Sequence, residues 1–383
     1  MRRALVAVVA LAAALVAPVQ TTTATRAGVA AAPPPRLAAS AWYLVGDDGV
    51  ILAARNERQK RAIASITKLM TALVVLERAR LSDVVRVSPS AARVRESTIY
   101  LRSGEELTVA ELLRGMLVPS ANDAAEALAL YVGRGSIDRF VRLMNAQAKE
   151  LGLTDTHFEN PHGLDEAGHV SSARDATVLV RQALGVPFIR DALGRETFSR
   201  PGRPVFETTD DLLASWPPLV AGKTGHTRDA GWSQAAAASG RGATVYGTVL
   251  GSDSQAARNG ALRDLLTYGL SRYRRVQAID AGRVYARAET GYGRGDVELV
   301  APRSIVRTIR VDARLTERVV APESVGLPVR MGERLGRVDV YEGRRLVASS
   351  PLVAAAGVSE PGILGKALWF VTRTAENLWG IVT

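Results

Sequence analysis

The chain has 383 residues, more than a single hydrophobic core usually spans, so we expect more than one domain. A composition with 47% hydrophobic and 23% charged residues excludes a largely disordered chain, and the absence of cysteine excludes disulfide frameworks and thiol nucleophiles. The formal net charge of +11 indicates an anionic partner, such as nucleic acid, a membrane or a cell wall.

The N-terminus has the pattern of an export signal. Two arginines precede an apolar run over residues 4–17, and a stretch rich in Thr, Ala and Pro follows. The run is shorter than the roughly twenty apolar residues that a membrane-spanning helix needs. We therefore predict a signal peptide and linker over residues 1–32, cleaved between Ala24 and Ala32, with an uncleaved anchor as the alternative. The protein is then exported to the extracytoplasmic face of the cell membrane, where nucleic acid is not an expected partner.

The middle of the chain, residues 38–272, predicts one mixed domain. A strand pair comes first, a block of helices follows, and three strands and a helix close the segment, which implies one antiparallel sheet flanked by helices in an α/β fold. The expected strands are 42–45, 50–53, 219–224, 231–238 and 243–251, and the expected helices are 64–78, 109–116 (opened by a Thr108–Glu111 capping box), 123–132, 136–151 and 254–268.

Two further segments complete the organisation. Residues 275–355 alternate as β-strands and predict a small all-β domain, and the stretch 272–345 contains sixteen arginines and ten acidic residues but no lysine or histidine. We do not expect chemistry in it. Residues 361–383 place Leu364, Leu368 and Val371 on one helical face beside tryptophans and basic residues. This pattern predicts an amphipathic helix on the membrane surface, with a helix packed on its own protein or a short span as alternatives.

Ser65-Ile-Thr-Lys68 offers a way to activate a hydroxyl. Residues three apart share a helical face, so the Lys68 amine can reach the Ser65 hydroxyl, and free N–H groups at a helix start suit a developing oxyanion. Arginine could not act as the base, because it does not lose its proton in proteins. A lysine here is informative in a chain with five lysines and forty-four arginines. The alternative is an exposed helical lysine.

Two more motifs carry hydroxyl, amide and amine groups. Ser120-Ala-Asn122 follows Pro119 at a break between two helices, where an ordinary helix cap is the alternative. Lys223-Thr-Gly225 lies on an expected strand, where the glycine would leave room for a substrate backbone. A charge that protects an edge strand is the alternative for that lysine.

The three motifs, in this order and context, resemble those of the low-molecular-mass penicillin-binding proteins of the serine D-alanyl-D-alanine carboxypeptidase type. The resemblance covers nearly everything after the signal. The segments that carry it besides the first motif are 111–123, 160–164, 169–175, 223–231 and 314–322. It implies a β-lactamase/transpeptidase-like antiparallel sheet flanked by helices, followed by a small all-β domain and a C-terminal amphipathic helix.

The resemblance also implies the chemistry. Ser65 would attack the carbonyl between the two terminal D-alanines of a peptidoglycan stem peptide, with Lys68 as general base. Ser120 would relay a proton to the leaving D-alanine, and Asn122 would hold the substrate amide. Lys223, Thr224, Thr227 and Arg258 would bind the terminal carboxylate of the substrate, and Gly225 lies on the same strand as a further substrate-binding residue. The backbone N–H groups of Ser65 and His226 would form the oxyanion hole. No metal or cofactor is implied, and β-lactams are expected to acylate Ser65. Burial beside Lys223 should lower the pKa of Lys68.

Other functions share parts of this pattern. The same motifs serve endopeptidases and transpeptidases of cross-linked peptidoglycan. A class A β-lactamase would need a Glu-x-x-Leu-Asn segment, which the sequence lacks. A non-catalytic wall-binding protein would not require the Ser–Lys pair.

A metal site is the remaining alternative. Six candidate ligands fall within thirteen residues: His157, Glu159, His162, Asp165, Glu166 and His169. The helical His-Glu-x-x-His motif is missing, however, and the segment has the composition of a loop. We therefore expect these histidines to be structural.

Overall fold

The computed structural model describes residues 18–29 and 32–382, which divide into two units. Residues 32–274 form a catalytic unit, and residues 18–29 join residues 275–382 in a β-rich unit. The predicted apolar leader, residues 4–17, lies outside the described residues.

The catalytic unit is organised around an antiparallel sheet with the strand order β3-β2-β10-β9-β8. Its strands are β2 (Ala41–Gly46), β3 (Ile51–Arg55), β8 (Leu219–Thr227), β9 (Gly231–Gly240) and β10 (Ala243–Ser252). Strands far apart in sequence therefore meet, and β8, the strand with the Lys-Thr-Gly motif, lies at one edge.

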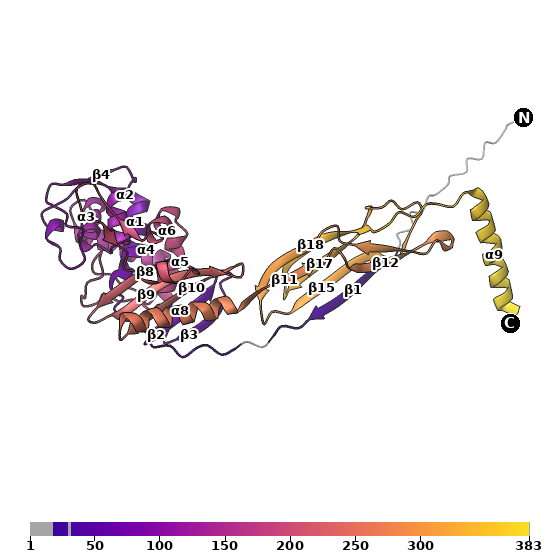
Figure 1. Cartoon of the computed structure of the whole chain (residues 1–383), viewed down its shortest axis with the longest axis horizontal. Coiled ribbons are helices and arrows are strands. Elements are labelled where there is room, and N and C mark those ends of the chain that lie inside the picture. The colour runs from indigo at the N-terminus through magenta and orange to yellow at the C-terminus, as the bar shows by residue number, and fades with distance from the viewer. Residues whose placement is uncertain (1–17, 30–31, 383) are drawn as a thin grey trace, which may run out of the picture. The chain divides into compact units, whose positions relative to one another are not determined.

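Helices cover both faces of this sheet (Figure 1). Successive side chains of a strand point to opposite faces, so Tyr43 and Val45 join one core while Trp42 and Leu44 join the other. The helix α8 (Gln255–Ser271) covers the second face. The helical block is made of α1 (Lys68–Arg78), α2 (Val109–Leu117), α3 (Asn122–Val132), α4 (Ile137–Glu150), α5 (Ala173–Leu184), α6 (Pro187–Leu193) and the short α7 (Leu212–Ser215). The expected fold class is confirmed.

The predicted capping box opens α2. The Thr108 side chain accepts a hydrogen bond from the backbone N–H of Glu111 at 3.2 Å, and the Glu111 carboxylate accepts one from the backbone N–H of Thr108 at 2.8 Å. The helix ends one residue later than predicted, and the segment between α2 and α3 contains Ser120 in a left-handed conformation with φ of 66°. This turn aims the Ser120 side chain at β8.

The β-rich unit has a main sheet in the order β1-β15-β17-β18-β13-β12-β16, with the pair β11-β14 beside it. Its core is aliphatic, with Ile279, Leu299 and Val338 among the fully buried residues. The strands are β1 (Val19–Arg26), β11 (Tyr273–Ile279), β12 (Val284–Thr290), β13 (Asp296–Val300), β14 (Ile305–Arg310), β15 (Leu315–Pro322), β16 (Ser324–Val325), β17 (Arg334–Glu342) and β18 (Arg345–Ala354).

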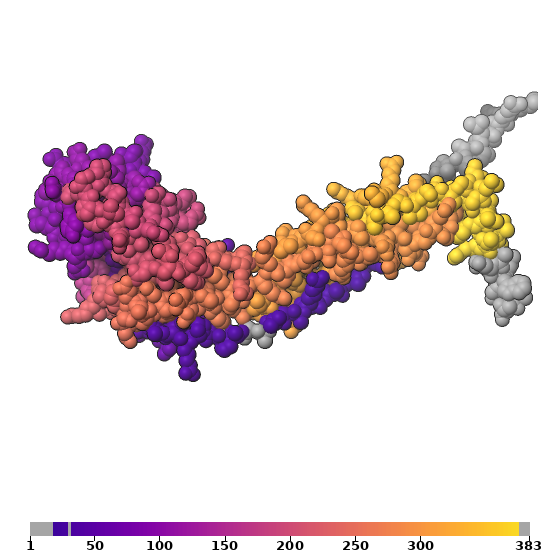
Figure 2. All heavy atoms as spheres, in the orientation of Figure 1, coloured from indigo at the N-terminus to yellow at the C-terminus, as the bar shows by residue number. Residues whose placement is uncertain are grey.

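Strand β1 differs from the sequence expectation, which places its residues in the signal peptide and linker. Val19 pairs with Pro322 and Arg26 with Leu315, so the strand is hydrogen-bonded to β15 along its full length. The space-filling view shows it as the indigo segment along the β-rich unit (Figure 2). The run of threonines favours a strand locally, but the pairing joins residues nearly three hundred positions apart, which sequence periodicity does not reveal.

The C-terminal helix α9 spans Ile363–Val382, close to the predicted range. Its first turns contact the β-rich unit through Trp369, whose ring lies 5.4 Å from that of Tyr292. The predicted apolar face remains uncovered, with Leu364, Leu368 and Val371 exposed by 88%, 67% and 66%. Within the described residues, no helix combines the length and the apolar character needed to cross a membrane.

Candidate active site

Ser65 and Lys68 lie together at the start of α1. A short 3-10 helix over Ala64–Thr67 carries the serine, and α1 begins at Lys68. The Lys68 Nζ lies 2.7 Å from the Ser65 Oγ, as the three-residue spacing predicts. Ala64 has a positive φ of 48°, which turns the chain sharply just before the serine.

Lys68 is completely buried, and its amine contacts only uncharged groups. Besides Ser65, Nζ donates to the Asn122 Oδ1 at 2.6 Å and to the His162 carbonyl oxygen at 2.9 Å. Those two partners can only accept hydrogen bonds. A neutral amine has two N–H groups and one lone pair, so with both N–H groups used its lone pair faces the Ser65 hydroxyl.

The electrostatics favour that neutral form. Burial, followed by the positive charge of Lys223, lowers the pKa of Lys68 well below its usual value, while the more distant Glu96 and Asp123 act in the opposite direction. The prediction of a lowered pKa is confirmed. Lys68 is therefore suited to accept the Ser65 proton near neutral pH.

Ser120 and Lys223 form a second pair. The Lys223 Nζ donates to the Ser120 Oγ and to the Thr224 carbonyl oxygen, each at 3.0 Å. Burial lowers the pKa of Lys223 to about 7, with the Asp210 carboxylate opposing the shift and the Arg258 charge adding to it. This amine therefore exchanges its proton close to neutrality.

Gly225 has a different role from the one expected. An added Cβ would lie 2.7 Å from the Ile63 carbonyl oxygen and 3.1 Å from the Ser65 nitrogen. The glycine therefore lets edge strand β8 approach the segment that carries the nucleophile, instead of only clearing space for substrate.

The other predicted residues of β8 have identifiable partners. The Thr224 and Thr227 hydroxyls lie 2.6 Å from the Thr209 hydroxyl and the Asp165 carboxylate respectively. The exposed His226 ring stacks on Trp232 with 4.1 Å between ring centroids. These contacts fix the edge of β8 that faces Ser65.

Arg258 is placed differently from the cleft residues. It is 1% exposed, and its guanidinium donates to Asp211 and Asn259 behind the strand. It also lies over the Trp232 ring at 5.7 Å. Arg258 is thus as buried as Lys68 and Lys223, its charge acts on Lys223, and its contact with the terminal carboxylate stays a prediction.

The loop over residues 159–164 supports the nucleophile, and the residue patterns did not predict this. The Thr71 hydroxyl donates to the Pro161 carbonyl at 2.6 Å, and the His162 carbonyl accepts from Lys68. Gly163 has φ of 88°, and a Cβ there would lie 1.9 Å from the Ala64 carbonyl oxygen. The Asn-Pro-His-Gly composition was the available signal, but it indicates only a loop.

Two histidines of the suggested metal cluster, His162 and His169, accept hydrogen bonds from backbone N–H groups of their own loop. The His169 Nε2 lies 2.7 Å from the Thr67 hydroxyl, and its Nδ1 accepts from the backbone N–H of Glu159. Burial lowers the pKa of His162 to about 3 and that of His169 to about 4, so both are neutral at pH 7. Among the described residues, no group of three or more His, Cys, Asp or Glu side chains could hold a metal ion.

Comparisons with known proteins agree with this geometry. The family model described as D-alanyl-D-alanine carboxypeptidase, peptidase S11, matches residues 28–254. The chain is 30% identical over 331 residues to D-alanyl-D-alanine carboxypeptidase DacF of Bacillus subtilis (83% of this chain, 85% of that one). It is 32% identical over 340 residues to DacD of Escherichia coli (83% and 86%).

Solved structures show the same similarity. Penicillin binding protein 5 from Haemophilus influenzae matches with a TM-score of 0.62 at 27% identity, over 86% of this chain and 100% of that one. The Streptomyces K15 DD-transpeptidase matches with a TM-score of 0.60 at 30% identity, over 62% and 99%.

Proposed function

The chain belongs to the D-alanyl-D-alanine carboxypeptidase family of serine hydrolases, and we propose that Ser65 is the nucleophile with which it removes the terminal D-alanine of a peptidoglycan stem pentapeptide. The observation that carries the proposal is the buried Lys68 amine, 2.7 Å from the Ser65 hydroxyl and without a carboxylate partner in the described part of the chain.

In the acylation step, the Ser65 hydroxyl gives its proton to the Lys68 amine while Oγ bonds to the carbonyl carbon between the two D-alanines. The backbone N–H groups of Ser65 and His226 stabilise the resulting oxyanion. The carbon–nitrogen bond then breaks as Ser120 delivers its proton to the leaving amine and takes up the proton that Lys68 received from Ser65, so that Lys68 is again neutral. Water hydrolyses the ester, which releases the shortened peptide and returns a proton to Ser65.

The substrate is held at two places in this proposal. Asn122, whose amide also contacts Lys68, binds the peptide amide. Lys223 attracts the terminal carboxylate, and Thr224 and Thr227 provide hydroxyls along the same strand. The negative charge of the substrate carboxylate stabilises the protonated form of the Lys223 amine. Substrate binding therefore favours the positively charged lysine that attracts the substrate.

Intact-mass measurement after exposure to benzylpenicillin tests the role of Ser65. We expect one added penicilloyl group, mapped to the peptide that contains residue 65, and none in a Ser65→Ala variant. An adduct that maps elsewhere, or no adduct at all, would contradict the proposal.

Transpeptidation is the second candidate, because the similar Streptomyces K15 protein is a DD-transpeptidase. The two reactions diverge after acylation, when either water or an amine attacks the ester. A pentapeptide incubated with an amine acceptor separates them: we expect free D-alanine with a tetrapeptide, not a peptide joined to the acceptor. A cross-linked dimer in a parallel reaction tests endopeptidase activity.

We also propose that the protein is exported and that α9 anchors it to the membrane surface. The uncovered Leu364, Leu368 and Val371 provide an apolar face, and Lys366 and Arg373 provide positive charge beside it. Flotation of the full chain with anionic vesicles tests this. Binding should be lost in a variant with Leu364, Leu368 and Val371 changed to serine, and it should persist in an Arg263→Gln control.

A further inference from the structure

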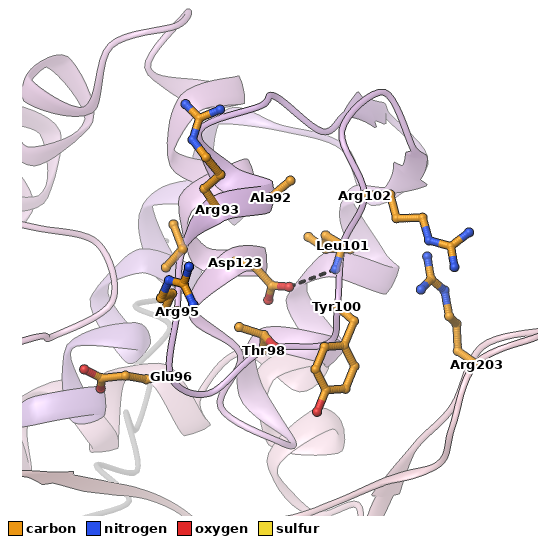
Figure 3. Close-up of a pocket in the computed structure, with 11 residues that line it drawn as sticks. Ala92, Arg93, Arg95, Glu96, Thr98, Tyr100, Leu101, Arg102, Asp123 and Arg203 are labelled. Atoms are coloured by element: carbon orange, nitrogen blue, oxygen red, sulfur yellow. Dashed lines mark hydrogen bonds between the residues drawn. The ribbon is translucent and has the colours of Figure 1, made fainter.

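A cavity of about 860 Å³ lies beside the second motif and is lined by four arginines, Arg93, Arg95, Arg102 and Arg203. We call it the arginine cavity. Figure 3 shows Arg93 and Arg95 on one side and Arg102 and Arg203 on the other, with Tyr100 at its rim. Ser65, Lys68 and Lys223 are not part of its lining.

The loop that forms the cavity is hydrogen-bonded to the catalytic segment. The Asn122 backbone N–H donates to the Ser97 carbonyl at 2.6 Å, and the Asn122 side chain donates to the Arg95 carbonyl at 3.2 Å. The Ser97 hydroxyl donates to the Pro119 carbonyl at 2.8 Å. The loop that lines the cavity is therefore hydrogen-bonded directly to the residue proposed to hold the substrate amide.

Two acidic residues, Glu96 and Asp123, also line the cavity, and Asp123 already has backbone hydrogen-bond donors. The Asp123 carboxylate accepts a hydrogen bond from the backbone N–H of Ile99 at 3.2 Å and one from that of Leu101 at 3.0 Å, the second of which is drawn in Figure 3. It fixes the turn between these residues and does not pair with an arginine. Glu96 forms no ion pair with Arg93, Arg95 or Arg102 in the part of the chain that the structure describes.

Three of the four arginines have no ion-pair partner in the described part of the chain. Arg203 shares Glu105 with Arg200, but Arg93, Arg95 and Arg102 form no ion pair within residues 18–29 and 32–382. Some exposed arginines elsewhere in the catalytic unit form ion pairs, as in Arg58–Asp155 and Arg195–Asp191. Three unpaired guanidinium groups around one cavity create a positive potential that favours an anion.

We propose that the arginine cavity binds a free carboxylate of the wall substrate, on a residue that precedes the D-alanyl-D-alanine dipeptide. This inference rests on the proposed function. A guanidinium matches a carboxylate in a paired, two-bond geometry, and the link through Asn122 places the cavity alongside the bound peptide. The carboxylate selects the stem peptide and orients it for attack by Ser65.

The test compares two synthetic pentapeptides that differ in one group, a free or an amidated side-chain carboxylate before the dipeptide. We expect the wild-type chain to release D-alanine from the free carboxylate form with about fivefold higher kcat/KM, since partly exposed ion pairs contribute modestly. The preference should shrink as salt is raised. In the Arg93→Gln/Arg102→Gln variant, the ratio of the two rates should fall to about one.

Arg263→Gln on α8 is the matched control, because Arg263 is an exposed arginine far from this loop in sequence. It should keep the wild-type ratio. Equal rates in the wild type, or a ratio that survives in the double variant, would overturn the inference. The inference would also be overturned if inorganic polyphosphate inhibited cleavage while the two peptides were cleaved at equal rates. That result would indicate that the arginine cavity binds a phosphate polymer.

The outcomes separate this inference from the proposed function. If neither peptide is cleaved and benzylpenicillin gives no adduct at Ser65, the proposed function fails. If both peptides are cleaved at equal rates, only the arginine cavity loses its role. If the double variant is acylated by benzylpenicillin at the wild-type rate and keeps the wild-type melting temperature, it is folded. If it is not folded, the single variant Arg102→Gln is used in its place.

Discussion

In the β-rich unit, buried carboxylates are neutralised by arginines. Glu317 is 5% exposed and accepts from Arg283 at 2.8 Å, and Asp339 is 3% exposed and lies 2.9 Å from Arg337. In the catalytic unit, the buried Lys68 and Lys223 contact only hydroxyls, an amide and carbonyl groups. The described part of the chain thus has buried charges in ion pairs in the β-rich unit, whereas Lys68 and Lys223 in the catalytic unit form no ion pair.

The catalytic unit also pairs a buried carboxylate, Asp175 with Arg174 at 3.2 Å, so the exception is confined to the two lysines. An opposite charge beside a buried ionisable group stabilises its charged form, whereas neutral acceptors in a dry site leave it free to lose a proton. Pairing serves a sheet that only has to be stable. An amine that has to accept a proton needs the second arrangement, at a cost in stability.

The largest expected effect comes from replacing the base by a cation that keeps its proton. Lys68→Arg should slow acylation by about a thousandfold, within the usual range for loss of a general base. Stopped-flow labelling with a fluorescent penicillin measures the rate, and Ser65→Ala sets the zero level. Labelling of the Lys68→Arg variant at the wild-type rate would show that Lys68 is not the general base.

A carboxylate placed beside Lys68 should make the catalytic unit resemble the β-rich one. Asn122→Asp puts an acid at the position that now contacts Nζ at 2.6 Å, which raises the pKa of Lys68. We expect acylation at neutral pH to fall about tenfold or more and to recover as the pH is raised. Asn122→Ala removes the amide without adding charge, so its deficit should not recover. A deficit in Asn122→Asp that is the same at every pH would argue against this account.

The pH dependence of the wild-type chain should have two limbs. Below the lowered pKa of Lys68 its amine is protonated, and kcat/KM falls on the acidic side. Above about pH 7, Lys223 loses the proton that attracts the substrate carboxylate, and kcat/KM should fall about tenfold per pH unit once well past that value. Steady-state D-alanine release measures both limbs. Lys223→Arg should lack the alkaline limb, and a limb that persists there must come from another group.

The smallest effect on activity should come from the paired charges. Glu317→Gln weakens the contact with Arg283 and should lower the unfolding free energy of the β-rich unit by about 1 kcal/mol, because the arginine is partly exposed. Acylation by penicillin should stay at the wild-type rate. A slowed acylation would show that the catalytic unit depends on this contact.

Sequence patterns predicted the parts of the site whose geometry is local. The Ser65–Lys68 contact and the Thr108–Glu111 capping box both depend on a spacing of three residues. Contacts through backbone groups were not predictable, because every residue has a carbonyl oxygen. The His162 carbonyl at Lys68 and the Arg95 carbonyl at Asn122 are of this kind, and they come from loops placed only by the tertiary fold.

The glycine of the third motif shows a related limit. A glycine on a strand predicts a close approach, and the approaching group turned out to be the backbone of Ile63–Ser65. Strand β1 is the clearest non-local case, since its partner β15 follows the entire catalytic unit in sequence.

The ladder between β1 and β15 gives processing of the N-terminus a structural meaning. A signal-peptidase cut between Ala24 and Ala32 would detach most or all of β1 as a peptide retained only by hydrogen bonds, and its departure would open the flank of β15 to another polypeptide. After a cut before Val19, β1 would remain covalently attached and would continue to cover this edge of β15. Edman sequencing of the mature protein distinguishes these two fates.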